Sequence, residues 1–476
     1  MGKIDIKYFG YIYILLFMFF GAMNKIFVPF SIIASAIFTV IIVSRVTKDN
    51  GISLVKGILT LLMFQNLCIG LGAHFAGNTD ESLKFITQIP FLSLVLSFVI
   101  LLFNKSIKIE KNQILTFTLL VICIIVSFLI GRGTLLSVLI NLRNLLTFFF
   151  AYCIGNYAIL TKKDLDSLVR FIFKLAFIFL MFGIILLIFG FDLYRIIGIK
   201  EVYIAKGAPI AGERLDDRFY TTLYKREFTR MGSLLYEPVN LAYFYSMSLL
   251  LSIFYKFDKK NKYSFIRVLY NFFGLVLTFG KGGYLLTTTI ILLYLFTKLF
   301  NRLKISKTII GSVRIATVLS LLIISTFVLY YSKNIGAAAT THFWAIQQTW
   351  NNVVHKPIGF GIGTGGNMAT LFNNGPLDTW LATGGESTLM SFLYQIGFQG
   401  VFCLILCMLS LRINLNKLDD VNNFSIMTYF IPLALIGISL FQDNTFTPQC
   451  IVIFMFIISA GKVIYNKKNK EIEESK

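Results

Sequence analysis

Glu386 opens a short pattern that could support acid–base chemistry: Glu386-Ser387, nine further residues, and then Gly397-Phe398-Gln399-Gly400. The carboxylate stands where an apolar helix is expected to begin. In that position it is able to accept a proton from a substrate hydroxyl and so act as a general base. The structural alternative is a first-turn carboxylate that only stabilises the positive end of the helix dipole.

Three cations stand where a phosphate-bearing substrate could be held. Arg230 lies shortly before Glu237, where a polar stretch enters an apolar helix, and its guanidinium suits paired hydrogen bonds to a diphosphate. Helix capping or loop anchoring explains Arg230 equally well. Lys281 projects from a glycine turn, where simple solvation is the alternative. Arg143 lies inside the apolar run 134–160, a costly and usually functional place, unless it snorkels or pairs with a backbone carbonyl.

A glycine-rich stretch, 357–366, follows two tryptophans, Trp344 and Trp350. Glycines permit close backbone approach, and their amides can form a nest for an anion or a sugar hydroxyl. The tryptophans could stack on sugar rings, but by residue type the aromatic belt of a membrane interface is the favoured interpretation.

The elements that must position these residues are membrane helices. The chain has 476 residues, of which 56% are hydrophobic and 14% are charged, and no soluble domain could cover so much apolar surface. Spanning segments must satisfy their backbone groups internally and are therefore helical. We predict an all-α polytopic membrane protein with about 14 transmembrane helices. The predicted ranges are 8–23, 26–43, 57–72, 86–103, 114–130, 134–160, 168–190, 234–256, 266–280, 284–300, 314–332, 386–411, 424–441 and 448–464.

Lysine and arginine gather in alternate loops, including 256–267 and 298–314, whereas the short loops opposite carry single charges such as Lys25, Arg132 and Lys281. By the positive-inside rule both termini are cytoplasmic, with a cytoplasmic tail at 465–476. The two long loops, 191–233 and 333–385, are then extracytoplasmic, and the second includes the Pro-Gly-rich segment. Residues 1–476 are expected to form a single membrane domain.

This placement excludes several classes of function. The net charge of +21 is spread over short loops beside lipid headgroups, and no nucleic-acid module accompanies it. A reaction at the outer face has no ATP, and the sequence has no Walker-type glycine loop. The energy for a reaction would have to be stored in the substrate, as in a sugar–diphosphate–lipid bond.

The order of these motifs resembles the O-antigen ligase and polymerase superfamily, and within it the Wzy-type polysaccharide polymerases. The resemblance rests on Arg230 to Pro238, on Leu277 to Gly283, and on 357–366 with Glu386-Ser387-x9-Gly397-x-x-Gly400. It covers residues from about 228 to 400, and the N-terminal helices match only as generic membrane spans.

The chain departs from the family pattern at three places. Ligases of the superfamily have His where this chain has Glu386, which favours a polymerase. The turn usually reads Ser-Arg-Gly, where this chain has Gly280-Lys281-Gly282. An arginine usually precedes the Pro-Gly loop; none occurs between Lys333 and Lys356, and His342 is the candidate replacement as a donor to the diphosphate.

The resemblance implies an enzyme of the bacterial plasma membrane that polymerises undecaprenyl-diphosphate-linked oligosaccharide repeat units into surface polysaccharide. Arg230, Lys281, Arg143, His342 and Glu237 would bind substrate, and Glu386 would deprotonate the attacking hydroxyl. No metal and no cofactor are implied. The expected partners are the lipid-linked donor and acceptor and membrane lipids, with a chain-length regulator as a further candidate and no nucleic acid.

Two rival functions stay open. An O-antigen-type ligase would transfer the glycan to another acceptor, and His at position 386 would have favoured it. A flippase or transporter of lipid-linked oligosaccharide should show inverted repeats and broken polar helices near the midplane. No repeat is obvious in this sequence, and Arg143 is the feature that favours transport.

Overall fold

The computed structural model consists of helices and one small β-hairpin, so the predicted all-α class is confirmed. Strand β1 (Tyr220–Leu223) pairs antiparallel with β2 (Arg226–Thr229). The structure describes residues 6–46, 50–80, 82–107, 109–205, 219–223, 226–257, 264–302, 337–366, 382–385, 387–412 and 423–474.

Among these residues, eight helical spans are long and apolar enough to cross a membrane, which indicates a multi-pass membrane protein. They are α2 (Phe27–Ser44), α3 (Gly51–Ala76), α4 with α5 (Leu83–Ile86 and Ile89–Phe103), α6 (Lys111–Ile130), α7 (Leu135–Ala158), most of α8 (Lys162–Ile196), most of α12 (Lys281–Arg302) and α17 (Thr388–Ser410). Shorter apolar segments come from α1 (Ile6–Met23), α10 (Pro238–Phe254), α11 (Ser264–Thr278), α18 (Asn423–Ile438) and α19 (Pro448–Glu474).

Each apolar range predicted from the sequence falls on a described helix, except 314–332, which lies outside the described residues. The boundaries differ where polar residues continue a helix. Helix α3 begins at Gly51 and not at 57, and α19 continues to Glu474, through most of the range predicted as a tail.

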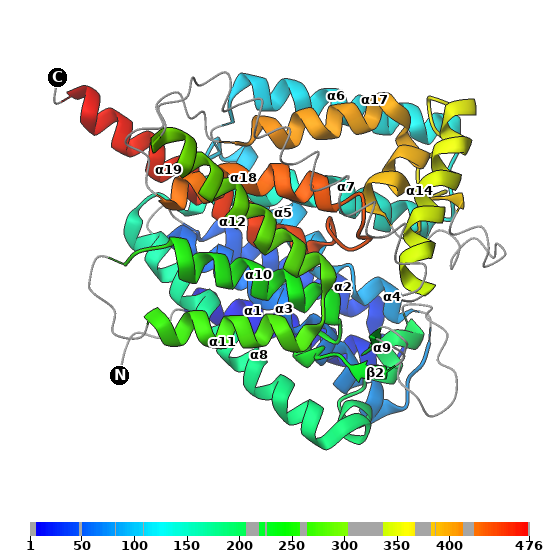
Figure 1. The fold of residues 1–476 in the computed structure, drawn as a ribbon. Helices are drawn as coiled ribbons and strands as arrows, with labels where there is room; N and C mark the ends of the chain where they lie inside the picture. The colour runs from blue at the N-terminus through cyan, green and yellow to red at the C-terminus, as the bar shows by residue number, and fades with distance from the viewer. Residues whose placement is uncertain are drawn as a thin grey trace.

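The two ranges predicted as long loops contain structure of their own. The first, 191–233, holds the end of α8, helix α9 (Ile199–Ala205) and the β-hairpin. The second, 333–385, holds helix α14 (Ala337–His355). In Figure 1, α4, α9, β2 and α14 gather at one end of the helices, and the last turns of α19 lie at the other.

Helix α3 forms the centre of the packing and α6 lies at its edge. In their most apolar windows, 72% of α3 is buried inside the protein but only 22% of α6. Helix α3 contacts α1, α5, α7, α8 and α19, whereas α6 runs beside α17 at the top of Figure 1. A site enclosed by protein is therefore to be sought around α3.

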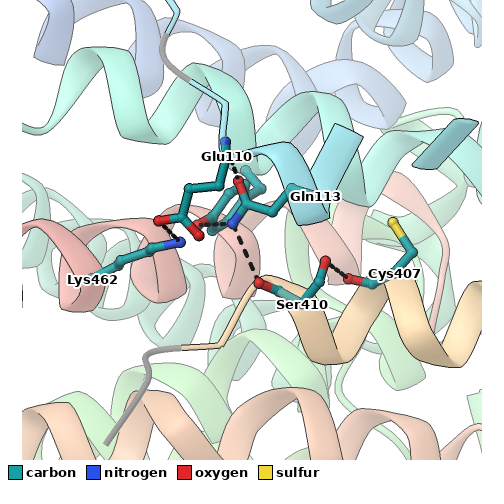
Figure 2. A network of polar contacts seen from close by, with 6 residues as sticks. Glu110, Gln113, Cys407, Ser410 and Lys462 are labelled. Atoms are coloured by element: carbon teal, nitrogen blue, oxygen red, sulfur yellow. Dashed lines mark hydrogen bonds and ion pairs between the residues drawn. The ribbon is translucent and has the colours of Figure 1, made fainter. Parts of the chain in front are cut away.

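A polar network fastens α6, α7, α17 and α19 to one another (Figure 2). Glu110 and Gln113 form the capping box that starts α6, and Lys462 Nζ lies 2.7 Å from Glu110 Oε1. Gln113 Nε2 donates to the Tyr152 hydroxyl at 3.0 Å and to the carbonyl of Ser410 at 3.3 Å. One amide side chain thus joins three helices at the start of α6.

Candidate functional site

A cavity of about 100 Å³ brings two of the predicted site residues together. Arg143 and Glu237 both line it, along with Lys84 and Gln88. Its walls come from α3, α4, α5, α7, α10 and α19. We refer to it as the Arg143 cavity.

Arg143 reaches this cavity from the third turn of α7. It stands eight residues after Leu135, the first residue of α7, which is about 12 Å along the helix. Arg143 Nη1 donates to Gln88 Oε1 at 3.1 Å, and Nε donates to Asn144 Oδ1 at 3.4 Å. The side chain is therefore held by amide oxygens inside the protein, and does not point into surrounding lipid.

Lys84 is the second cation of the cavity, and it was not among the site residues predicted from the sequence. It is 8% exposed and lies in the short helix α4. The preceding segment is fixed because Asp80 Oδ1 accepts the amide of Ser82 at 2.7 Å. The hydrogen bond from the Ser82 amide, more than nearby Lys25, holds the pKa of Asp80 below its ordinary value. In the sequence, the one feature that marks Lys84 is its position immediately before an apolar span.

Glu237 places a carboxylate at the same cavity. It is 2% exposed and precedes α10, which Pro238 starts because proline suits the first position of a helix. The side chain makes no capping hydrogen bond to α10. Instead the Tyr203 hydroxyl donates to the Tyr236 carbonyl at 2.6 Å and approaches Glu237 Oε2 at 3.4 Å. A helix-capping role for Glu237 is therefore not supported.

Amide side chains complete the wall. Asn66 Oδ1 and Gln65 Oε1 are buried and have no hydrogen-bond partner among the described residues. Asn66 Nδ2 donates to the carbonyl of Leu235 at 2.5 Å, and both Asn66 and Gln65 line the cavity. Buried acceptors without donors are costly, so they point to a ligand or water that supplies hydrogen bonds.

Of the described residues that line the cavity, the charged ones are two cations, Lys84 and Arg143, and one carboxylate, Glu237. Burial makes such charges expensive unless counter-charges accompany them, so one cation in excess favours an anionic ligand. Acceptor oxygens beside the cations suit hydroxyl groups on that ligand. The arrangement fits a molecule that carries both phosphate and hydroxyl groups.

Arg230 and Lys281 lie together at a different place. Arg230 Nε donates to the carbonyl of Thr278 at 3.1 Å, and its backbone amide donates to Phe219 at 2.7 Å. Lys281 is the exposed first residue of α12, at the end of the turn that Thr278 begins. Neither residue lines the Arg143 cavity. The structure supports loop anchoring for Arg230.

The glycines of this turn serve helix packing. A Cβ at Gly283 would lie 2.6 Å from the carbonyl oxygen of Ala242, and a Cβ at Gly280 would lie still closer to the Ala242 side chain. The two glycines therefore allow α12 to start directly against α10.

Backbone amides of the glycine-rich stretch 357–366 are hydrogen-bonded within the protein. The amide of Gly361 donates to the carbonyl of Gln395 at 3.1 Å, and that of Gly363 donates to Gln395 Oε1 at 2.7 Å. Gly397 bends α17 with φ of +68°, so the backbone of Pro357 and Ile358 fits against it. The interpretation of these amides as an anion nest was therefore wrong for Gly361 and Gly363, since both are already hydrogen-bonded.

Two predicted residues cannot be placed by their side chains. Glu386 lies outside the described residues, and His342 belongs to α14 but its side chain lies outside them as well. The residues after position 386 are well anchored: Ser387 Oγ caps α17 at Met390 and donates to the carbonyl of Ser439 at 3.0 Å. This segment thus packs against the chain that leads to Asn444, which lines the cavity.

Trp344 and Trp350 are about half exposed on α14, and Trp350 meets the ring of Phe398 at 5.5 Å edge to face. Their exposure agrees with the aromatic-belt interpretation. Within the described ranges, no three His, Cys, Asp or Glu side chains are grouped so that they could hold a metal ion.

Comparison of the chain with protein-family models, with curated proteins and with solved structures finds no match in any of the three.

Proposed function

We propose that this chain is a polysaccharide polymerase, which joins undecaprenyl-diphosphate-linked oligosaccharide repeat units at the outer face of a bacterial plasma membrane. The observation that carries the proposal is that Lys84, Arg143 and Glu237 line one buried cavity. The motifs of residues 228–400 that resemble Wzy-type polymerases supply the reaction class.

The proposed sidedness follows from the lysine and arginine asymmetry of the loops. With about 14 spans and cytoplasmic termini, the first turns of α5, α7, α10 and α19 lie on the outer side. Those turns and the segments just before them supply Gln88, Glu237 and Gln449, and the third turn of α7 supplies Arg143; all four residues line the Arg143 cavity. The cavity is then in the outer half of the membrane, where a lipid-linked sugar would be presented after export.

The proposed reaction is a glycosyl transfer. A hydroxyl oxygen of the acceptor sugar attacks the anomeric carbon of the donor, and the bond from that carbon to the diphosphate oxygen breaks. The electron pair of the broken bond leaves with undecaprenyl diphosphate, and Glu386 takes the proton of the attacking hydroxyl. The main contribution expected from the protein is stabilisation of charge on the leaving diphosphate.

Within this scheme Arg143 and Lys84 hold the diphosphate, and the free oxygens of Asn66 and Gln65 accept hydrogen bonds from hydroxyl groups near it. The cavity is far smaller than the roughly 300 Å³ or more of typical sites for drug-sized ligands. It suits a phosphate-sized group, so the rest of the glycan would lie outside it. Glu237 is the second candidate for the base, because its carboxylate faces the cavity.

The placement of Arg143 also favours a second candidate function, transport. A cation inside a membrane span that lines an interior cavity is what a flippase for lipid-linked oligosaccharide would need. A ligase would use the same donor but would deliver the glycan to a different acceptor.

The test uses purified protein in proteoliposomes with undecaprenyl-diphosphate-linked repeat units. A polymerase yields a ladder of glycan lengths and one undecaprenyl diphosphate per linkage formed. A flippase moves the lipid-linked glycan across the bilayer without releasing diphosphate, and a ligase forms no ladder from repeat units alone. Either of these results would replace the proposed function.

A further inference from the structure

A second, basic groove lies between α3 and α8 and shares no lining residue with the Arg143 cavity. It has a volume of about 380 Å³ and is lined by Lys56 of α3 and by residues of the first turns of α8. The lining residues of α8 are Lys163, Asp166, Ser167, Arg170, Phe171 and Lys174. We refer to it as the Lys56 groove.

The groove carries a large excess of positive charge. Four cations line it against the single carboxylate of Asp166. That carboxylate is already engaged, because the Tyr255 hydroxyl donates to Asp166 Oδ1 and Arg170 Nη2 lies 4.0 Å from Oδ2. Among the described residues, Lys163 and Lys174 make no hydrogen bond or ion pair. The groove is therefore an attractive place for an anion.

Part of the groove is held rigidly by its neighbours. Lys56 Nζ donates to Ser167 Oγ at 2.6 Å, which joins α3 to α8. The Arg170 guanidinium lies 5.5 Å from the centre of the Phe257 ring. These contacts fix two of the four cations before any ligand arrives, which lowers the entropic cost of binding.

The cations of α8 continue into an apolar stripe on the same face of the helix. Successive positions three or four residues apart share a face. Starting from Lys163, this spacing passes through Arg170 and Lys174 and then reaches only exposed apolar side chains. These are Phe177 at 52% exposure, Met181 at 46%, Ile185 at 39% and Ile188 at 72%.

We propose that the Lys56 groove binds an anionic phospholipid, with its phosphate among the four cations that line the groove and an acyl chain along the exposed stripe of α8. A soluble anion would neutralise the cations but would leave the apolar stripe of α8 uncovered. Lys174 stands six residues inside the predicted span 168–190, about 9 Å along α8, and from this depth its long apolar stem extends the ammonium toward the headgroup level.

The occupant is a phospholipid and not the polyprenyl diphosphate of the proposed reaction, because the groove lies at the basic end of α8. That end faces the cytoplasmic leaflet by the positive-inside rule, where anionic phospholipids attract clusters of lysine and arginine. This inference does not rest on the proposed enzymatic function, since it needs only that α8 spans the membrane with its basic end on the cytoplasmic side.

The experiment compares lipid retention by the full chain, measured by native mass spectrometry after incorporation in nanodiscs of mixed phosphatidylglycerol and phosphatidylcholine. The wild-type protein is expected to retain phosphatidylglycerol preferentially. The double substitution Lys163→Gln and Lys174→Gln is expected to weaken that preference by about 30-fold, at roughly fivefold per cation removed. Neither lysine makes a hydrogen bond or ion pair with another described residue, so the double substitution should leave the fold intact.

The matched control is Lys111→Gln with Lys162→Gln, which removes the same charge from exposed positions at the same basic side but outside the groove. It should keep the wild-type preference. The proposal is overturned if the groove variant keeps the preference, or if the control loses as much. It is also overturned if polyprenyl phosphate displaces phosphatidylglycerol at equimolar amounts, because the groove would then be a site for the carrier lipid.

Discussion

Nη1 of Arg143 donates a hydrogen bond of 3.1 Å to Oε1 of Gln88, and so links a cation inside α7 to the segment between α4 and α5. The amide of Gln88 is itself oriented, because its Nε2 donates to Oγ1 of Thr87 at 2.9 Å. The guanidinium is thus positioned in the cavity before a ligand binds. A reaction in which a group is transferred to or from a phosphate is accelerated by positive charge that is already in position before the ligand binds.

Arg143→Ala is expected to reduce donor use by about 10–100-fold at low donor concentration, because a hydrogen bond to a charged group is lost in a buried site. Arg143→Lys should restore part of the rate, since it keeps the charge but loses the planar pair of donors. The measurement is initial release of undecaprenyl diphosphate by purified variants at equal protein level.

Arg132→Ala is the matched control, because Arg132 is exposed in the short segment before α7 and does not line the cavity. It should leave the initial rate unchanged. Equal rates for wild type and Arg143→Ala would mean that Arg143 is a structural residue only.

Lys84→Ala tests the cation that the sequence did not suggest. A reduction of about tenfold in donor use is expected, because Lys84 is buried at the same cavity as Arg143. Lys25→Ala removes a lysine from a neighbouring loop whose side chain is 74% exposed and 3.7 Å from Asp80. The idea of a two-cation site is refuted if both variants behave alike in the diphosphate-release assay.

Gly397→Ala is expected to lower the melting temperature of the protein in detergent more than Gly77→Ala does. Both glycines have a positive φ, +68° at Gly397 and +62° at Gly77. With ψ of 25°, Gly77 is in the left-handed helical region, which alanine enters at a cost of about 1–2 kcal/mol, whereas with ψ of −176° Gly397 is in a region that essentially only glycine adopts. A Cβ at Gly397 would also collide with the backbone of Pro357 and Ile358, whereas a Cβ at Gly77 meets no described atom within 4 Å. Similar melting temperatures for the two variants would show that the bend in α17 does not depend on this close approach.

Reporter fusions test the proposed sidedness. Reporters placed in 191–233 and 333–385 should read as extracytoplasmic, and those in 256–267 and 298–314 as cytoplasmic, because lysine and arginine concentrate in the latter two. A cytoplasmic result for either of the first two ranges would remove the reaction from the outer face.

The helices follow from the sequence because apolar runs of spanning length leave the chain no other structure in lipid. Arg143 could be singled out for the same reason, as a charge in such a run. Lys84 could not, because only the packing of α4 against other helices buries it, and a lysine beside a span ordinarily stays at the surface. The contact partner of Arg230 and the close backbone approach at Gly397 could not be predicted from the sequence either. Each depends on a segment far away in the chain, Thr278 for Arg230 and Pro357 for Gly397.

The most direct test of the account is polymer formation by the purified protein in proteoliposomes, measured for wild type and Glu386→Gln with undecaprenyl-diphosphate-linked repeat units. The wild-type protein should produce a glycan ladder, and Glu386→Gln should bind donor normally but turn over about 10²–10⁴-fold more slowly, the usual range for loss of a general base. Unchanged polymerisation by Glu386→Gln would contradict the assignment of the base and shift it to Glu237. Absence of any ladder from folded wild-type protein would contradict the central claim that this chain is a polymerase.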